Sequence, residues 1–224
     1  MENKKRVIGV LGLGLFGSAI ARRLAKQGIE VIGCDRLEDH VRELENYLTV
    51  GGVGDFTDPD FLKGLGIASC NVVVIGTGSD LGASVLGVIN CQELGVDRII
   101  CKAKNKRYGQ ALMALGVSRV VLSEVESGYH VADIISRQSI EDVIKLDDET
   151  AVVEFRVPEA WLHRELNDLD LRNRYDLNII GIRKQSKEPL FTQFGPEYVF
   201  RSEDIVVAVA NTAKFDTIDN LERL

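Results

Sequence analysis

The sequence of 224 residues contains few of the side chains that build metal and redox centres. It has three histidines and four cysteines, which stand at Cys34, Cys70, Cys91 and Cys101. No two of these cysteines are spaced as Cys-x-x-Cys, so the sequence indicates neither a zinc knuckle nor a thioredoxin-like redox site. Three of them lie in or beside apolar, strand-like runs, and we therefore expect buried, reduced thiols.

Long apolar runs and an excess of positive charge are also missing. No uncharged apolar run reaches the roughly 18 residues that a membrane-spanning helix needs, so we expect no direct insertion into a membrane. The formal net charge is −7 and the basic residues form no stripe. This charge pattern argues against nucleic acid as a partner.

Groups suited to acid–base catalysis are scarce. None of the five tyrosines has a lysine four residues further on, which is the pattern of the short-chain reductases. His40 lies in an expected surface helix, His130 in an expected connecting helix and His163 in a loop, where solvated or packed histidines are common. The sequence therefore gives no sign that the protein is an enzyme.

A glycine-rich loop near the N-terminus is the strongest pattern that is present. Residues 12–17, Gly-Leu-Gly-Leu-Phe-Gly, follow an apolar run and open a helix-like stretch that ends near Gly28. The next apolar run, residues 29–34, ends at Asp35. A strand, a glycine loop, a helix and a second strand that ends in an acid are typical of a dinucleotide-binding unit.

The parts of this pattern have separate physical roles. Gly12 permits a tight turn, Gly14 lets backbone amides approach a phosphate, and Gly17 allows the helix to pack against the sheet. The helix N-terminus attracts an anion. Asp35 is suited to accept hydrogen bonds from a ribose 2′-hydroxyl. Its charge disfavours a 2′-phosphate, although the adjacent Arg36 weakens that repulsion.

Strand-like and helix-like stretches alternate up to about residue 122, which predicts an α/β fold with a doubly wound parallel Rossmann sheet. Six strands are expected, over residues 6–11, 30–34, 48–51, 72–75, 98–101 and 119–122. Five helices are expected between them, over residues 16–27, 37–45, 59–65, 81–94 and 106–115. Asp58 marks a helix start, and Gly28, Gly95 and Gly116 mark helix ends.

The pattern changes after the sixth strand. Residues 124–140 are expected to form a crossover helix, and a small α+β domain is expected to follow. Its strands are predicted over residues 143–146, 151–157, 177–183 and 204–210, with a short helix over 168–174 and a final helix capped by Asn211. The predicted organisation is therefore a Rossmann domain at 1–123, a crossover helix at 124–140 and a C-terminal domain at 141–224.

With these features the whole chain resembles the RCK-domain (TrkA-N/TrkA-C) cytosolic regulatory subunits of bacterial Ktr/Trk potassium uptake systems. The glycine loop and Asp35 are similar to the nucleotide loop and ribose acid of that family. Gly54-Asp55 resembles its Gly-Asp near the adenine, and Lys102-Ala103 its recurring Lys-Ala. The resemblance implies a nucleotide site made of Gly12, Leu13, Gly14, Leu15, Phe16, Gly17, Asp35, Arg36, Asp55, Phe56, Thr77, Gly78, Lys102 and Glu124.

Two positions depart from the family pattern. Leu122-Ser123 precede Glu124, where Ktr relatives carry His-Pro before a glutamate that serves a cation site between protomers. Glu124 is carried over as a candidate ligand of a divalent or monovalent cation at a dimer interface. Leu15 stands where some ATP-responsive relatives have an arginine that reaches the terminal phosphate. Because leucine cannot bind a phosphate, ATP, ADP and NAD(H) all stay open as ligands.

The resemblance also implies an assembly and its partners. Homodimers are expected to form an octameric ring docked on a membrane potassium channel subunit, in the cytoplasm at the inner face of the membrane, where nucleotide exchange gates the pore. Cyclic di-AMP binds the C-terminal domain of some relatives, and the residues to watch here are Arg174, Asn178, Ile179 and Ile180. The alternative that the residues leave open is a small NAD-dependent oxidoreductase.

Overall fold

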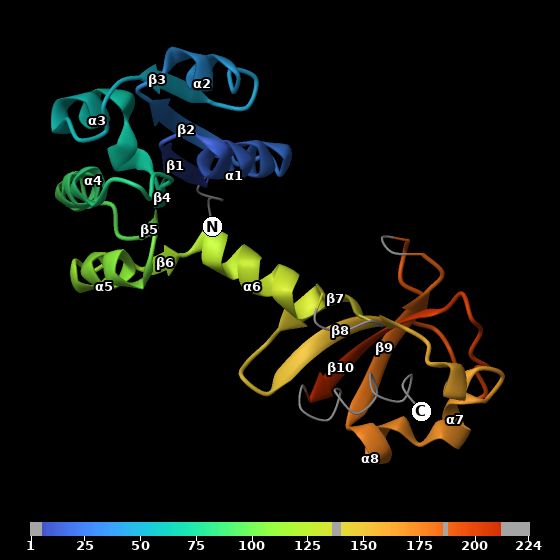
Figure 1. Ribbon diagram of the computed structural model, residues 1–224. Helices are drawn as coiled ribbons and strands as arrows, with labels where there is room; N and C mark the ends of the chain where they lie inside the picture. The colour runs from blue at the N-terminus through green and yellow to red at the C-terminus, as the bar shows by residue number, and fades with distance from the viewer. Residues whose placement is uncertain (1–5, 136–139, 186–187, 212–224) are drawn as a thin grey trace, which may run out of the picture. The chain divides into compact units, whose positions relative to one another are not determined.

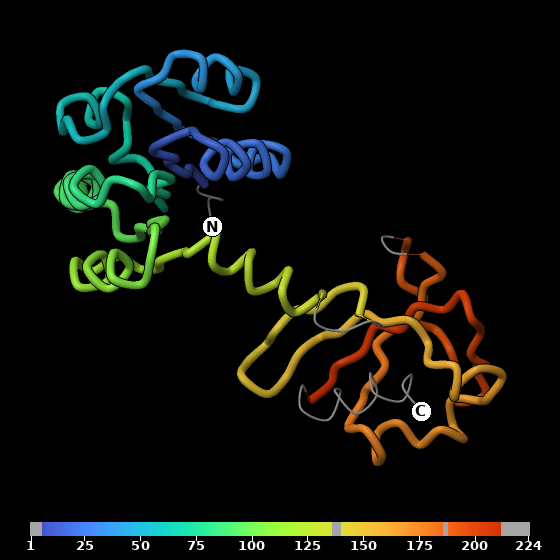
Figure 2. The backbone as a smooth tube through the Cα atoms, viewed as in Figure 1, coloured from blue at the N-terminus to red at the C-terminus, as the bar shows by residue number. Residues whose placement is uncertain are grey.

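The chain divides into two compact units, residues 1–126 and residues 127–224. The computed structural model describes residues 6–135, 140–185 and 188–211. Figure 1 shows one sheet in each unit, and Figure 2 follows the backbone through them. Among the described residues, no helix combines the length and the apolar character needed to cross a membrane.

The first unit is built on a six-stranded sheet in the order β3-β2-β1-β4-β5-β6, and all neighbouring strands are parallel. This arrangement confirms the predicted doubly wound Rossmann sheet. Within these strands the charged residues stand only at the ends and the rest are apolar or glycine, because helices cover both faces of the sheet. The strands are β1 (Val7–Leu11), β2 (Glu30–Asp35), β3 (Val50–Val53), β4 (Val72–Ile75), β5 (Ile99–Lys102) and β6 (Arg119–Val121).

Two layers of helices enclose this sheet (Figure 1). One hydrophobic cluster holds side chains of α1 and of the segment around α2, and another holds side chains of α3, α4 and α5. Asp58 caps α3 by accepting hydrogen bonds from two of its backbone N–H groups, as the sequence predicts. The helices are α1 (Leu15–Lys26), α2 (Glu38–Arg42), α3 (Pro59–Leu65), α4 (Leu81–Glu93) and α5 (Lys106–Ala114), with a 3-10 turn, η1, at Ile67–Ser69.

The second unit contains a four-stranded antiparallel sheet in the order β7-β8-β10-β9. Its core centres on the buried Trp161, whose ring lies 5.9 Å from that of Phe155 and 5.8 Å from that of Phe200, between centroids. The strands are β7 (Ile140–Lys145), β8 (Thr150–Arg156), β9 (Leu177–Arg183) and β10 (Ile205–Asn211). The remaining elements are α6 (Ser123–Ile135), η2 (Glu159–Trp161), α7 (Leu166–Leu169) and α8 (Leu171–Tyr175).

Several predicted elements differ from those observed. The helix predicted over 124–140 is too long, because Ile140 already pairs with Phe155 in the antiparallel sheet. The helix predicted over 168–174 is divided by Asp170, which has a left-handed φ of +46°. The third strand begins later than predicted, since the N–H of Leu48 still bonds to the turn that follows α2. The predicted C-terminal helix after Asn211 lies outside the described residues.

Candidate functional site

The glycine loop lies where β1 turns into α1. Gly12 has a φ of +88°, a left-handed conformation that favours glycine. A Cβ on Gly17 would lie 1.9 Å from the carbonyl oxygen of Gly12, so no side chain fits there. A Cβ on Gly14 would have no atom within 4 Å. Gly12 and Gly17 are therefore required by the fold of the loop, whereas Gly14 borders open space.

The N-terminus of α1 is open for an anion. Gly14 is the N-cap residue of this 12-residue helix, and as a glycine it supplies no side-chain hydrogen bond to the first turn. The N–H groups of the first turn have no partners within the helix and carry part of its positive dipole. Leu15, in this first turn, is 95% exposed. Because Gly14 has no side chain to block the approach, this helix N-terminus is suited to bind a phosphate.

Asp35 at the end of β2 holds the glycine loop in place. Its Oδ2 accepts a hydrogen bond of 2.7 Å from the N–H of Leu13, and its Oδ1 accepts one of 2.9 Å from the N–H of Leu37. Burial raises the pKa of Asp35, but these bonds and the neighbouring His40 outweigh it and leave the pKa below its usual range. The carboxylate is thus charged and keeps lone pairs that can still accept from a ribose hydroxyl.

Two basic side chains accompany the acids at this end of the site. The Nδ1 atom of His40 lies 3.2 Å from Oδ2 of Asp35. The guanidinium of Arg36 donates to Asp55 over 2.6 Å, and the other carboxylate oxygen of Asp55 accepts from the N–H of Thr57. The glycine-loop pattern predicts Asp35 at the site and the family resemblance implies Arg36 and Asp55, but neither indicates the contact of His40 with Asp35.

Two adjoining cavities form a cleft in front of the glycine loop, and they share Thr77 and Ser79. Of the predicted residues, Leu13 is buried, Gly17 packs in the loop and Asp55 pairs with Arg36, so these three do not line the cleft. One cavity, of about 620 Å³, is lined by Gly14, Leu15, Phe16, Gly76, Thr77, Gly78, Ser79, Lys102, Lys104 and Glu124. The other, of about 320 Å³, is lined by Gly12, Asp35, Arg36, Phe56, Thr77, Ser79, Asp80 and Ala83.

The cleft also contains residues that the sequence analysis did not select. Ser79 and Asp80 precede α4, and Asp80 caps this helix by accepting a hydrogen bond of 3.0 Å from Ala83. Lys104 follows β5 and adds a second cation near Lys102. Each of these residues lies just beyond the carboxyl end of a strand, which is where parallel sheets place ligand contacts. That position is the signal that could have identified them.

Lys102 and Glu124 form the polar wall of the larger cavity. The ammonium of Lys102 donates to Oε1 of Glu124 over 2.6 Å and lies 5.7 Å from the ring centroid of Phe16. The hydrogen bond from Lys102 lowers the pKa of Glu124 to about 2. No group of three metal-ligating side chains occurs within residues 6–135, 140–185 and 188–211. The cation role of Glu124 stays a prediction.

The residues selected for cyclic di-AMP lie on α8 and β9 of the second unit. Asn178 accepts a hydrogen bond of 2.7 Å from Nε of Arg172, and both line a cavity of about 440 Å³ with Ile179. Arg174 lies outside that lining, with its guanidinium 5.3 Å from the ring centroid of Tyr175. Binding of cyclic di-AMP stays a prediction.

The structure also resembles solved RCK domains. The crystal structure of the GsuK RCK domain matches with a TM-score of 0.66 at 17% identity, over 99% of this chain and 48% of that one. The GsuK channel bound to NAD matches with a TM-score of 0.65 at 18% identity, over 99% of this chain and 40% of that one. This chain thus spans less than half of those proteins, and at this identity the likeness concerns the fold alone.

Family models and curated proteins identify the family. The TrkA-N domain model matches residues 8–123 and the TrkA-C domain model matches residues 152–222. Ktr system potassium uptake protein C of Bacillus subtilis (strain 168) is 32% identical over 207 residues, 92% of this chain and 93% of that protein. Protein A of the same system and organism is 27% identical, over 97% of each chain. The chain belongs to the TrkA-N/TrkA-C family of Ktr system potassium uptake proteins.

Proposed function

We propose that this protein is the nucleotide-sensing subunit of a membrane potassium uptake system. Family membership supports the connection to potassium, because two relatives that cover nearly its whole length are named for potassium uptake. The observation that supports a nucleotide as the ligand is the cleft. It combines the glycine-capped N-terminus of α1, the carboxylate of Asp35 and the ammonium of Lys102. These groups are suited to bind the phosphates and the ribose of a nucleotide. In this proposal the protein senses the nucleotide and does not convert it.

The ligand of this site is an adenine nucleotide: ATP, ADP or NAD(H). A ribose would bind to Asp35, and phosphates would bind to the first turn of α1 and to Lys102. One structural neighbour is the GsuK channel bound to NAD, which agrees with this class of ligand. Leu15 offers no charge to a terminal phosphate, so discrimination between ATP and ADP would depend on Lys102 and Lys104.

Signal transmission would begin at the ion pair between Lys102 and Glu124. A phosphate near Lys102 competes with Glu124 for the same ammonium, and Glu124 lies in the first turn of α6. A Glu124 carboxylate released from Lys102 is free to bind a cation at a dimer interface. In the proposed octameric ring, a ligand shifts the equilibrium between two conformations of the ring. The size of this shift is limited by the difference in the ligand's affinity for the two conformations. Cyclic di-AMP at the second unit would be a further input.

The proposed partner is a membrane potassium channel subunit, with the ring on its cytoplasmic side. Rubidium uptake into cells that lack other potassium uptake systems tests this, with the membrane subunit expressed alone or with this protein. We expect the wild-type protein to change uptake, and Asp35→Asn to abolish the change. Uptake that is indifferent to this protein would contradict the proposed partner.

Calorimetry with ATP, ADP and NADH tests the ligand directly. Asp35→Asn should weaken adenine nucleotide binding tenfold or more, because a charged hydrogen-bond acceptor contributes about 1.5–3 kcal/mol. Asp58→Asn is the matched control, since asparagine also caps a helix and Asp58 serves only α3. Unchanged affinity in Asp35→Asn would overturn the ribose assignment. Substrate-dependent oxidation of NADH would favour the alternative, a small oxidoreductase.

A further inference from the structure

A buried polar side chain of α4, that of Asn90, holds the loop that follows β3. Asn90 is 7% exposed, and its Nδ2 donates to the carbonyl oxygen of Thr57 over 3.0 Å and to that of Phe56 over 3.3 Å. These two acceptors define the orientation of the amide group, because its own oxygen would be repelled by both carbonyl oxygens. Asn90 therefore anchors two consecutive residues of the loop to α4.

A glycine of the same helix leaves room for the ring of Phe56. A Cβ on Gly87 would lie 2.9 Å from two ring atoms of Phe56 and 3.2 Å from a methyl group of Ile75. The i, i+3 spacing places Gly87 and Asn90 on the same face of α4. Alanine would be the better helix residue at this position. Gly87 therefore costs helix stability and allows the ring of Phe56 to pack closely against α4.

Phe56 belongs to the end of the cleft where a base would lie. Lys102, a proposed phosphate ligand, lines the larger cavity, whereas Phe56 lines the smaller one together with Asp35 and Arg36. A nucleotide runs from phosphate through ribose to base, so a ribose at Asp35 directs the base toward Arg36 and Phe56. Phe56 is 6% exposed, and its position therefore depends on the groups that pack against it.

We propose that Gly87 and Asn90 are positioning residues of the nucleotide site, which hold Phe56 where it contacts the base. Neither Gly87 nor Asn90 lines the two cavities of the cleft, so both act on the ligand through Phe56. Part of the binding free energy then comes from the base, through a side chain whose position is set by α4. This inference rests on the proposed function and assigns the residues that shape the base end of its site.

The first test removes the hydrogen bonds of Asn90. Asn90→Leu keeps a side chain of similar size, and the Kd of ADP, measured by calorimetry on the full chain, should rise about three- to tenfold. Gln92→Met is the matched control, because Gln92 also lies on α4 and its Nε2 donates over 2.8 Å to the carbonyl oxygen of Leu115, which lines neither cavity. This control should bind ADP as the wild type does. An unchanged Kd in Asn90→Leu would overturn the positioning role of Asn90.

A second test keeps the proposal falsifiable if Asn90→Leu does not fold. Gly87→Ala should displace the ring of Phe56 and raise the Kd of ADP about threefold or more, whereas in a Phe56→Leu background it should change the Kd by less than about twofold. A flexible leucine can move away from the added Cβ, which the ring cannot do. Equal effects in both backgrounds would overturn the role of Phe56. Failure of ATP, ADP and NADH to bind the wild-type protein would overturn the proposed function instead.

Discussion

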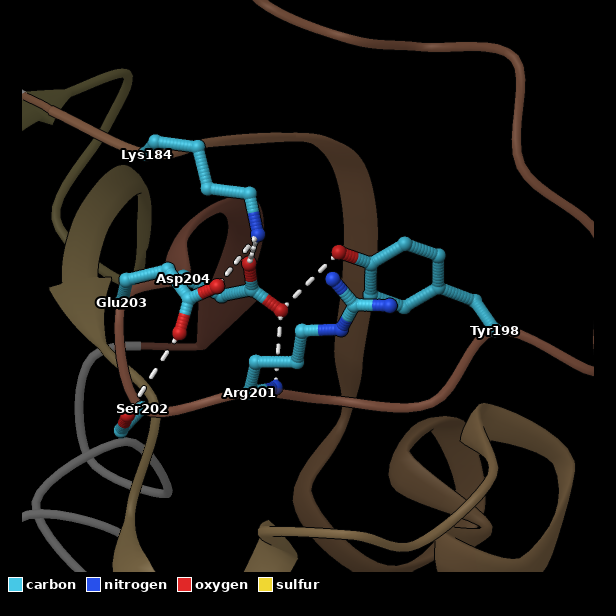
Figure 3. A network of polar contacts seen from close by, with 6 residues as sticks. All are labelled: Lys184, Tyr198, Arg201, Ser202, Glu203 and Asp204. Atoms are coloured by element: carbon cyan, nitrogen blue, oxygen red, sulfur yellow. Dashed lines mark hydrogen bonds and ion pairs between the residues drawn. The ribbon is translucent and has the colours of Figure 1, made fainter.

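At the scale of single residues, Asp204 is the buried charge on which the second unit depends. Its side chain is fully buried at the turn before β10 (Figure 3). One oxygen accepts from the ammonium of Lys184 over 2.7 Å, and the other accepts from the hydroxyl of Tyr198 and the N–H of Arg201, both over 2.9 Å. Three donors therefore converge on one carboxylate. Two come from the segment just before Asp204 and one follows β9, so the carboxylate fixes the turn against the end of β9.

Asp204→Asn should destabilise the second unit by about 2–3 kcal/mol. Its NH2 group would replace one of the two carboxylate oxygens, so the donors that face that oxygen would lose their acceptor. The fluorescence of Trp161, the one tryptophan of the chain, reports unfolding of this unit in a urea titration. Glu203→Gln is the matched control, since Glu203 is exposed and bonds to the same Lys184 over 3.2 Å. Equal midpoints for the two variants would show that the buried contacts of Asp204 contribute nothing specific.

At the scale of elements, the sequence predicts best where local chemistry decides the structure. The predicted bounds of α3, β4 and β9 agree with those observed, because apolar runs, caps and turn residues define them. Asp170 divides a predicted helix through a left-handed backbone conformation that no periodicity reveals. The contact of His40 with Asp35 depends on how α2 packs against β2, which a spacing rule does not contain. Tertiary packing therefore determines those features of the elements and of the site that the sequence pattern does not predict.

The glycine loop allows fold and binding to be separated by substitution. Gly17→Ala forces a Cβ to 1.9 Å from the backbone oxygen of Gly12 and should destabilise the first unit by about 3 kcal/mol or more. Gly14→Ala meets no atom and should cost only about 1 kcal/mol or less, because alanine is a poorer N-cap residue than glycine. Its methyl group would project beside the first turn of α1 and weaken nucleotide binding by roughly tenfold, through loss of a charged hydrogen bond.

Circular dichroism melts and calorimetry on the same samples check this contrast. Gly64→Ala serves as the control, because Gly64 lies inside α3 with no atom near its Cβ position. Alanine there should stabilise the helix by about 0.5–1 kcal/mol without changing nucleotide affinity. Wild-type affinity in Gly14→Ala would mean that phosphate does not bind at the N-terminus of α1.

At the scale of the whole molecule, each unit has its own hydrophobic core. The first unit holds one cluster on each face of its parallel sheet, and the second holds a cluster around Trp161. The proposed nucleotide groups all belong to the first unit. A ligand that binds only the folded first unit stabilises that unit by about 2.7 kcal/mol at a hundred times its Kd. The second unit gains nothing from the same ligand unless the two unfold together.

We therefore expect two unfolding transitions that respond differently to nucleotide. With NADH or ATP in excess, the transition of the first unit should rise by roughly 10 °C in a calorimetric scan. The midpoint followed by Trp161 fluorescence should stay constant, because this residue lies in the core of the second unit. In Asp35→Asn the same nucleotide concentration should produce a much smaller rise. A Trp161 midpoint that increases together with the first transition would contradict independent unfolding of the two cores. It would mean that nucleotide binding to the first unit also stabilises the second unit.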